Sequence, residues 1–247
     1  RQLVADLHAA LDRAEQLDVR VVVLTHTAPA FCAGADLKER GTGPTSNQPM
    51  ASAMERLASC AAPTIAAVSG SVRAGGIGIM ASCDLVVVNS AVTFAFTEVR
   101  IGVAPAMISV PILARCSWSK LAAPFLTGET FAAAAARDMG LVTHVTDDVD
   151  ATVAQLVAGV LAGAPKAVAA TKQVLRQTQP KMSEMLVLSE ALFGSDEAAE
   201  GMSAFAEKRP PSWATMSGTI VAKIRGDTDE SGPRTRTLDG PKTAYPS

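Results

Sequence analysis

The chain has few aromatic residues, almost no charge imbalance and no long apolar run. Aromatic residues make up 4% of its 247 residues, fewer than a surface that stacks nucleic-acid bases would need. The formal net charge is −2, so no basic excess attracts nucleic acid or an anionic membrane. No apolar stretch is long enough to span a bilayer, and no signal-peptide pattern opens the sequence. We therefore expect neither a nucleic-acid nor a membrane partner.

Patterns typical of disulfides and metal sites are missing as well. The cysteines are scattered without a CxxC pair, and the histidines lack the spacing of metal ligands. We expect reduced, buried thiols in a cytoplasmic protein, and no metal site. The residues concerned are Cys32, Cys60, Cys83, Cys116, His8, His26 and His144.

What the sequence does contain is an alternation of helix and strand patterns. Apolar residues recur at helical spacing over 3–16, and the run VRVVVL that follows has the β-branched composition of a strand. Such pairs continue along the chain, which predicts an α/β layer structure. The expected helices are 3–16, 50–60, 74–84, 105–115, 117–126, 130–138, 149–163, 165–178 and 182–206, and the expected strands are 19–24, 65–68, 85–90, 92–96 and 141–145.

These patterns divide the chain into three parts. Residues 1–145 form the expected α/β core, and 146–213 form a helical C-terminal region. Residues 214–247 are polar, rich in Gly, Pro, Thr and charge, and lack apolar periodicity. We expect this last part to be a disordered or weakly attached tail.

Two strand exits pass through very small residues. The stretch AFCAGADLKE, Ala30 to Glu39, follows one predicted strand, and SGSVRAGGIGIMASCD, Ser69 to Asp84, follows another and enters a helix. The first amides of a helix have no internal acceptor and lie at its positive end. Two such exits could each supply one backbone N–H to a single oxygen, which is the construction of an oxyanion hole.

The glycine segment has two other interpretations. Residues 76–81 fit the dinucleotide-binding pattern G-x-G-x-x-A, but the pattern does not directly follow the first strand. The next strand also ends in Asn-Ser, without the acid that would bind a ribose, so we disfavour a nicotinamide cofactor. Close packing of Gly76 and Gly78 against the sheet is the remaining alternative.

From Arg1 to about Trp213 the sequence resembles the enoyl-CoA hydratase/isomerase (crotonase) family. The resemblance implies a crotonase-like spiral of ββα units and a helical trimerisation region, assembled as a homotrimer or homohexamer. The family also has a β-hairpin before its first helix, and this sequence begins inside that helix. The motifs that carry the resemblance are AFCAGADLKE, PTIAAVSG, AGGIG, CDLVVV, FTEVRIGVAP, FLTGETFAAAAARDMGLVTHV and EGMSAFAEKRPPSW.

The resemblance assigns site residues position by position. It places the two oxyanion amides on Ala35 and Gly75, and the loop bordering the CoA thioester on Ala33, Asp36 and Leu37. Gly75 also belongs to the expected substrate-binding residues. Asp36 has a simpler alternative role, because it could cap the helix that begins at LKER.

The second catalytic glutamate of the family falls on Glu98. From the residues alone, Glu98 could instead be paired with a neighbour such as Arg100. Lys208 matches a segment near CoA at a subunit boundary and could meet a CoA phosphate, or simply be solvated. Gly78 stands where hydratases of the family commonly carry another glutamate.

The leading hypothesis is an enoyl-CoA hydratase that adds water to a 2-enoyl-CoA through an oxyanion hole and one glutamate. The first alternative is an isomerase that shifts a 3-enoyl to a 2-enoyl double bond. The second is a subunit that binds acyl-CoA or assists assembly without turnover. No cofactor is expected, because coenzyme A is part of the acyl-CoA substrate.

Overall fold

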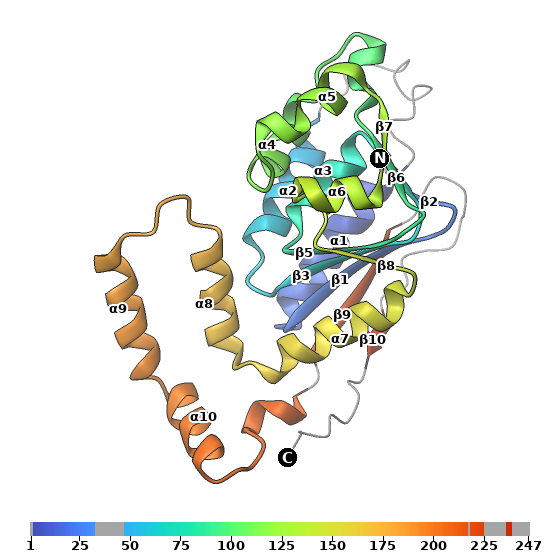
Figure 1. Cartoon of the computed structure of the whole chain (residues 1–247). Helices are drawn as coiled ribbons and strands as arrows, with labels where there is room; N and C mark the ends of the chain where they lie inside the picture. The colour runs from blue at the N-terminus through green and yellow to red at the C-terminus, as the bar shows by residue number, and fades with distance from the viewer. Residues whose placement is uncertain (1, 33–46, 217, 225–235, 239–247) are drawn as a thin grey trace.

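The structure is a computed structural model that describes residues 2–32, 47–216, 218–224 and 236–238. Two sheets and the helices around them form the core, and an arm of helices leads away from it (Figure 1). The helices are α1 (Gln2–Gln16), α2 (Gln48–Ser59), α3 (Gly75–Ser82), α4 (Ala106–Leu113), α5 (Trp118–Thr127), α6 (Ala133–Met139), α7 (Val149–Ala162), α8 (Pro165–Leu175), α9 (Met182–Phe193) and α10 (Asp196–Ala206), with 3₁₀ turns η2 (Thr97–Ile101) and η3 (Ser212–Thr215).

The larger sheet has the strand order β10-β9-β1-β3-β5-β8. All its neighbouring pairs are parallel except β10 with β9. Its central strands are runs of β-branched and small apolar residues, as expected for strands covered on both faces. The strands are β1 (Val21–His26), β3 (Thr64–Val68), β5 (Leu85–Asn89), β8 (His144–Thr146), β9 (Thr219–Ile224) and β10 (Arg236–Leu238).

The smaller sheet has the order β2-β4-β6-β7. Strands β2 (Ala30–Cys32), β4 (Ser71–Arg73) and β6 (Thr93–Ala95) are parallel, and β7 (Thr130–Ala132) is antiparallel to β6. Because parallel neighbours end at the same edge of a sheet, the chain leaves β2, β4 and β6 side by side. The ends of β2 and β4, which precede the two small-residue stretches, therefore lie at the same edge.

The core fills both sides of the larger sheet. Helix α3 is buried from Gly76 onward, between the sheets and helices α2 and α4. Helix α7 covers the opposite face, where Val149, Val153 and Val157 point into the sheet. These valines recur at helical spacing, so the predicted helix 149–163 is confirmed.

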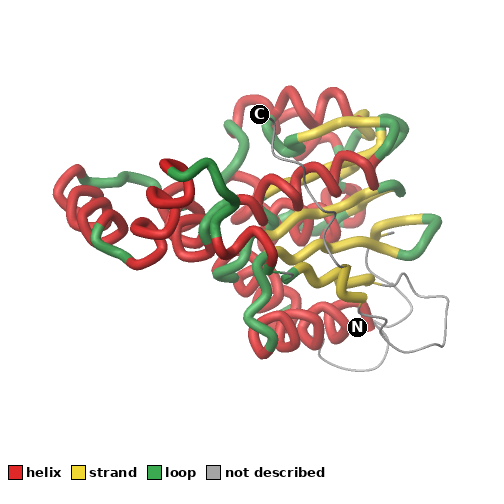
Figure 2. The backbone as a smooth tube through the Cα atoms, turned by 90° about the horizontal axis from the view of Figure 1, so that it is seen from below, coloured by secondary structure: helices red, strands yellow, loops and turns green. Residues whose placement is uncertain are grey.

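The helical arm consists of α8, α9 and α10 (Figures 1 and 2). One helix was expected over 182–206, but the chain breaks at Gly194. Ser195 caps α10 by accepting a hydrogen bond from the Ala198 N–H, which favours a new helix start there. Helix α9 has no buried residue. Among the described residues no single helix is long and apolar enough to cross a membrane, although the bent pair α7–α8 passes that test jointly.

The prediction of a disordered tail is wrong for Thr219–Ile224. This segment forms β9, parallel to β1 and in register from Val21 opposite Thr219 to His26 opposite Ile224. Its buried residues are Thr219, Ile220, Ala222 and Ile224. The segment is too short and too closely flanked by polar residues for composition to reveal it. Two smaller boundaries also differ. The strand expected at 141–145 is β8, which spans His144–Thr146, and the helix expected from 130 begins at Ala133, after β7.

Candidate active site

The N-terminus of α3 lies where β4 ends. Ala74 has a positive φ of 45°, a backbone conformation that costs free energy in a non-glycine residue and is often kept at functional sites. Gly75 is the first residue of α3, so its N–H has no acceptor within the helix. A Cβ added at Gly75 would meet, among the described residues, only the Met50 side chain, at 3.5 Å. Among the described residues the space beside the Gly75 Cα is therefore open.

The next glycines have a packing role instead. A Cβ on Gly76 would lie 2.3 Å from the Cys32 Cβ, at the end of β2. A Cβ on Gly78 would lie 2.7 Å from Ile108 and 2.9 Å from the Met54 sulfur. Close packing against the sheet is therefore confirmed for Gly76, whose neighbours lie on β2 and β4, whereas Gly78 packs against α4 and α2 instead. The same contacts leave no room for a glutamate at position 78.

Glu98 lies on η2, directly after β6. The turn is held in place by Phe96, which is fully buried and packs against Phe125 with ring centroids 4.1 Å apart. Gly102 ends the turn in the left-handed conformation, with φ 78°. The backbone that carries Glu98 is therefore fixed by the aromatic core behind it.

The Glu98 carboxylate is unusual because one of its oxygens, Oε2, is buried without a hydrogen-bond partner among the described residues. Arg100, the partner considered from the sequence, instead donates its Nε–H to the Thr127 carbonyl at 3.1 Å. The ion-pair interpretation is therefore wrong. Burial raises the pKa of Glu98, against a smaller opposite effect of its own backbone N–H.

Sheet geometry brings Gly75 and Glu98 to the same edge. Arg73 on β4 is opposite Ala95 on β6, and the Ala74 N–H donates to the Ala95 carbonyl at 3.4 Å. Neighbouring strands lie about 4.8 Å apart, and each residue follows its strand end by only two or three positions. A helix N-terminus and a carboxylate with a raised pKa are the parts needed to stabilise an oxyanion and move a proton.

Of the other predicted site residues, Ala33, Ala35, Asp36 and Leu37 lie outside the described residues. Lys208 follows α10, is exposed, and has a φ of 52°. Figure 1 shows α10, the helix before Lys208, in the arm and away from α3 and β6.

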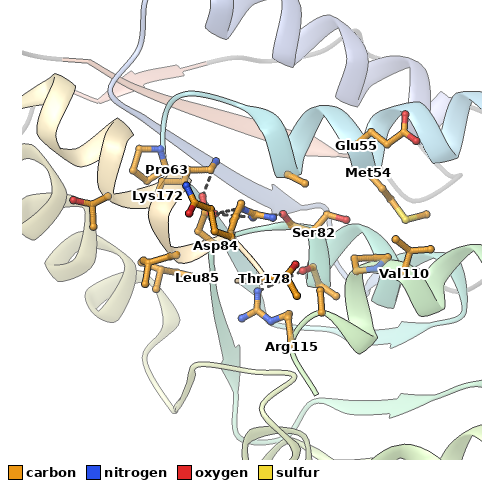
Figure 3. Close-up of a pocket in the computed structure, with 18 of the residues that line it drawn as sticks. Met54, Glu55, Pro63, Ser82, Asp84, Leu85, Val110, Arg115, Lys172 and Thr178 are labelled. Atoms are coloured by element: carbon orange, nitrogen blue, oxygen red, sulfur yellow. Dashed lines mark hydrogen bonds and ion pairs between the residues drawn. The ribbon is translucent and has the colours of Figure 1, made fainter. Parts of the chain in front are cut away.

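The structure also contains a groove, away from Gly75 and Glu98, that was not predicted from the sequence. A half-open groove of about 1070 Å³ lies between α2, α3, α4 and α8 (Figure 3). Its walls are mostly apolar, and neither Gly75 nor Glu98 lines it. No local motif signals it, because its walls come from four separate helices. The principal apolar wall residues are Met54, Met107, Val110, Leu113, Val168 and Leu175.

One wall of the groove carries an ion-pair cluster around Asp84. Its Oδ2 accepts from Thr64 N–H at 2.8 Å and Lys172 Nζ at 2.8 Å, and its Oδ1 accepts from Arg176 Nη2 at 2.7 Å. Arg176 also donates to the Ser82 carbonyl, and Arg115 donates to the Cys83 carbonyl. These cations satisfy the C-terminal carbonyls of α3.

Comparison with known proteins defines the class of fold first. The structure is similar to that of an enoyl-CoA hydratase from Mycobacterium smegmatis, with a TM-score of 0.78, 30% identity, and coverage of 86% of this chain and 88% of that one. An enoyl-CoA hydratase structure from Mycobacterium avium gives a TM-score of 0.63 at 41% identity, with coverage of 85% and 86%. The chain therefore has the crotonase fold, as the sequence predicted.

The sequence comparisons then give the family. The family model described as enoyl-CoA hydratase/isomerase matches residues 1–216. The 2,3-dehydroadipyl-CoA hydratase of Escherichia coli is 33% identical over 221 residues, which cover 85% of this chain and 86% of the relative. The chain belongs to the enoyl-CoA hydratase/isomerase family.

Proposed function

We propose that this protein adds water to the double bond of a 2-enoyl-CoA thioester, with Glu98 as its only acid/base carboxylate. The observation that carries the proposal is the buried, unpartnered Oε2 of Glu98, on the same sheet edge as the start of α3. Family membership and the hydratase named above support a CoA thioester as the substrate class.

In this mechanism the thioester oxygen lies against the Gly75 N–H. The second donor is the predicted Ala35 amide. Glu98 removes a proton from water, the water oxygen bonds to C3, and the π electrons move through C2 to give the enolate oxygen. Glu98 then returns the proton to C2, which completes the addition. Each backbone donor is worth about 2.7–4 kcal/mol in comparable oxyanion holes.

A single carboxylate is a consequence of the packing at Gly78. Since Ile108 and Met54 fill the space beside it, no second acid can project from this position of α3. In the proposed mechanism Glu98 therefore carries both proton transfers. The raised pKa of Glu98 suits this, because a group that both takes and gives a proton works best with a pKa near the operating pH.

The lack of a carboxylate at position 78 also favours a second candidate, the isomerase. There Glu98 would take a proton from C2 of a 3-enoyl-CoA and return it at C4, with the enolate held by the same amides. Neither water activation nor a second carboxylate is required. The two reactions differ in substrate, and crotonyl-CoA with a 3-enoyl thioester of matched length separates them.

The decisive test is Glu98→Gln, measured by single-turnover rate and by the dissociation constant of an acyl-CoA. Gln keeps the size of the side chain but cannot act as a carboxylate base, so the rate should fall by at least about 10²-fold. Affinity should hardly change, because the lost interaction belongs to the transition state. The matched control is Glu129→Gln, an exposed glutamate at the end of α5, which should turn over like the parent.

Equal rates for the parent and Glu98→Gln would refute the catalytic role of Glu98. A parent that binds an enoyl-CoA but converts neither thioester would instead be the acyl-CoA-binding subunit considered from the sequence. Conversion of only the 3-enoyl thioester would identify the isomerase.

We also propose that copies of the chain assemble, as a homotrimer or homohexamer. Helix α9 exposes Met182, Leu186, Val187 and Phe193, with exposed fractions from 56% to 83%. A large apolar face of this kind is typical of an interface. The groove between α2, α4 and α8 offers a complementary apolar surface, with the basic Arg115 and Arg176 on its wall.

In this assembly α9 of one copy would occupy the groove of the next. The exposed Phe205 and Lys208 would also reach a neighbouring site, as the resemblance implies. Light scattering should give the mass of a trimer or hexamer, and Leu186→Glu should shift it toward the monomer. A monomeric parent at micromolar concentration would contradict the proposal.

A further inference from the structure

His26 connects the two segments that lead to the predicted backbone donors. It is the last residue of β1, and the chain turns from it into β2. Its Nε2 accepts a hydrogen bond from the Ser69 N–H at 3.0 Å. Its Nδ1 lies 3.2 Å from the Thr27 carbonyl. Its ring packs edge-on against Phe31 of β2, with centroids 5.6 Å apart and planes at 69°.

Both contacted residues lie upstream of a donor. Phe31 is fully buried in the middle of β2, and β2 leads to the segment that contains Ala35. Ser69 begins the turn into β4, and β4 ends at Ala74 and Gly75. The imidazole is therefore a bridge between the starts of two short parallel strands, and their ends form the predicted site.

The two turns beneath the ring touch backbone to backbone. A Cβ added at Gly70 would lie 2.3 Å from the Pro29 carbonyl oxygen and 2.9 Å from the Ala30 Cα. A shift of one turn must therefore move the other. From the far side, the Ile224 carbonyl of β9 accepts the Thr27 N–H at 3.1 Å, so the start of the first turn is held on both sides.

These contacts assign the protonation state of the ring. Because Nε2 accepts a hydrogen bond, it carries no proton, and Nδ1–H then donates to the Thr27 carbonyl. Burial lowers the pKa of His26 and outweighs the opposite effect of hydrogen bonds to the Thr27 and Ala30 backbone, while the charge of Lys223 on β9 adds a smaller lowering effect. The neutral form that the two hydrogen bonds require is thus the stable one.

We propose that His26 is a positioning residue that fixes β2 relative to β4, so that both backbone donors converge on one thioester oxygen. The proposal rests on the function proposed above and adds a residue that touches neither substrate nor the reacting atoms. Two strands of three residues each transmit the constraint. Misplacement of reacting groups by about 1 Å can reduce a rate by about 10²-fold, so a small loss of registration is enough to matter.

The experiment compares His26→Leu with His26→Gln. Leu keeps most of the volume and removes both hydrogen bonds, while Gln can accept from Ser69 and donate to Thr27. We expect kcat of His26→Leu to fall by about 10–10²-fold with little change in KM, and His26→Gln to recover most of the rate. The control is His144→Leu. His144 lies on β8, an edge strand of the larger sheet, and its Nδ1 is hydrogen-bonded only to the Thr143 hydroxyl among the described residues.

Hydrogen exchange supplies a readout that does not depend on turnover. The Ser69 amide should exchange faster in His26→Leu and be protected again in His26→Gln. If the parent converts no enoyl-CoA, the function proposed above fails, and Ser69 exchange alone tests the positioning role. A parent-like rate in His26→Leu, unchanged Ser69 exchange, or equal loss in both variants would each overturn the proposal.

Discussion

The two ends of helix α3 differ in whether the polar groups around them have hydrogen-bond partners. At the N-terminal end the Gly75 amide has no acceptor within the helix, and the nearby Glu98 has a buried oxygen without a partner among the described residues. At the C-terminal end both oxygens of Asp84 are bonded, and arginines bond the last carbonyls.

The difference separates a functional end from a structural end. Unsatisfied buried polar groups cost stability, and they are retained where a ligand completes them. The Asp84 carboxylate, in contrast, uses both of its oxygens in hydrogen bonds and ion pairs and has no free lone pair for chemistry. The comparison therefore predicts that substitutions at one end of α3 change activity, while those at the other end change stability.

The largest effect is expected from Asp84→Asn. The substitution leaves Lys172, whose side chain is 7% exposed, without its buried counter-charge. Breaking a buried pair in this way costs about 3–5 kcal/mol, to be measured by denaturant unfolding. The double variant Asp84→Leu/Lys172→Met removes both charges and should recover part of the loss. A single variant as stable as the parent would break the comparison at its structural end.

The second largest effect is expected from Gly75→Val, which should reduce turnover. The position has room for a Cβ, since the Met50 contact of 3.5 Å is an ordinary one. The protein should therefore fold, by circular dichroism, while the branched side chain keeps the thioester oxygen from the amide. Loss of one donor is worth about 2.7–4 kcal/mol of activation free energy. Retained turnover would show that Gly75 serves packing alone.

Gly78→Ala sharpens the contrast from within the same helix. Its new methyl would lie 2.7 Å from Ile108, so the seam between α3 and α4 must open. Overpacking of this kind typically costs about 1–3 kcal/mol of unfolding free energy. Thermal unfolding checks this, and a melting temperature equal to that of the parent would contradict the packing role.

The smallest effect concerns the stability of Glu98→Gln. Because burial raises the pKa of Glu98 in the folded state, its charged form opposes folding once the pH exceeds that raised pKa. Gln carries no charge, so the variant should melt slightly above the parent at neutral pH. The two should converge below the ordinary pKa of a glutamate. A variant that melts lower at neutral pH would mean that the carboxylate is paired after all.

Much of this could be predicted from the sequence because the signals are local. The alternation of strands and helices, the glycine-rich start of α3 and the family motifs around Glu98 each lie within one short stretch. The packing role of Gly76 and Gly78 was open from sequence, since the atoms that exclude a side chain come from Cys32, Met54 and Ile108, far away in the chain.

What could not be predicted depends on partners distant in the sequence. Arg100 was a reasonable partner for Glu98 by proximity, but the fold directs it to the Thr127 carbonyl. Strand β9 is too short to be recognised in a polar segment, and its burial depends on β1, β10 and α1, which are distant in the sequence. The groove and the bridging contacts of His26 likewise arise only when separate elements are packed together.

The pairing of β1 with β9 makes the sheet dependent on the order of folding. Strand β1 is the first strand in the chain, and β9 follows nearly every other described element. The inner pairs of β1 with β3 and β3 with β5 close short loops, while the β1–β9 pair must close a loop of almost the whole chain, at a greater entropic cost. During synthesis one edge of β1 therefore stays unpaired until residue 224 has emerged. An exposed strand edge is a template for association with other chains. The newly made protein is therefore most prone to aggregate before β9 has been synthesised.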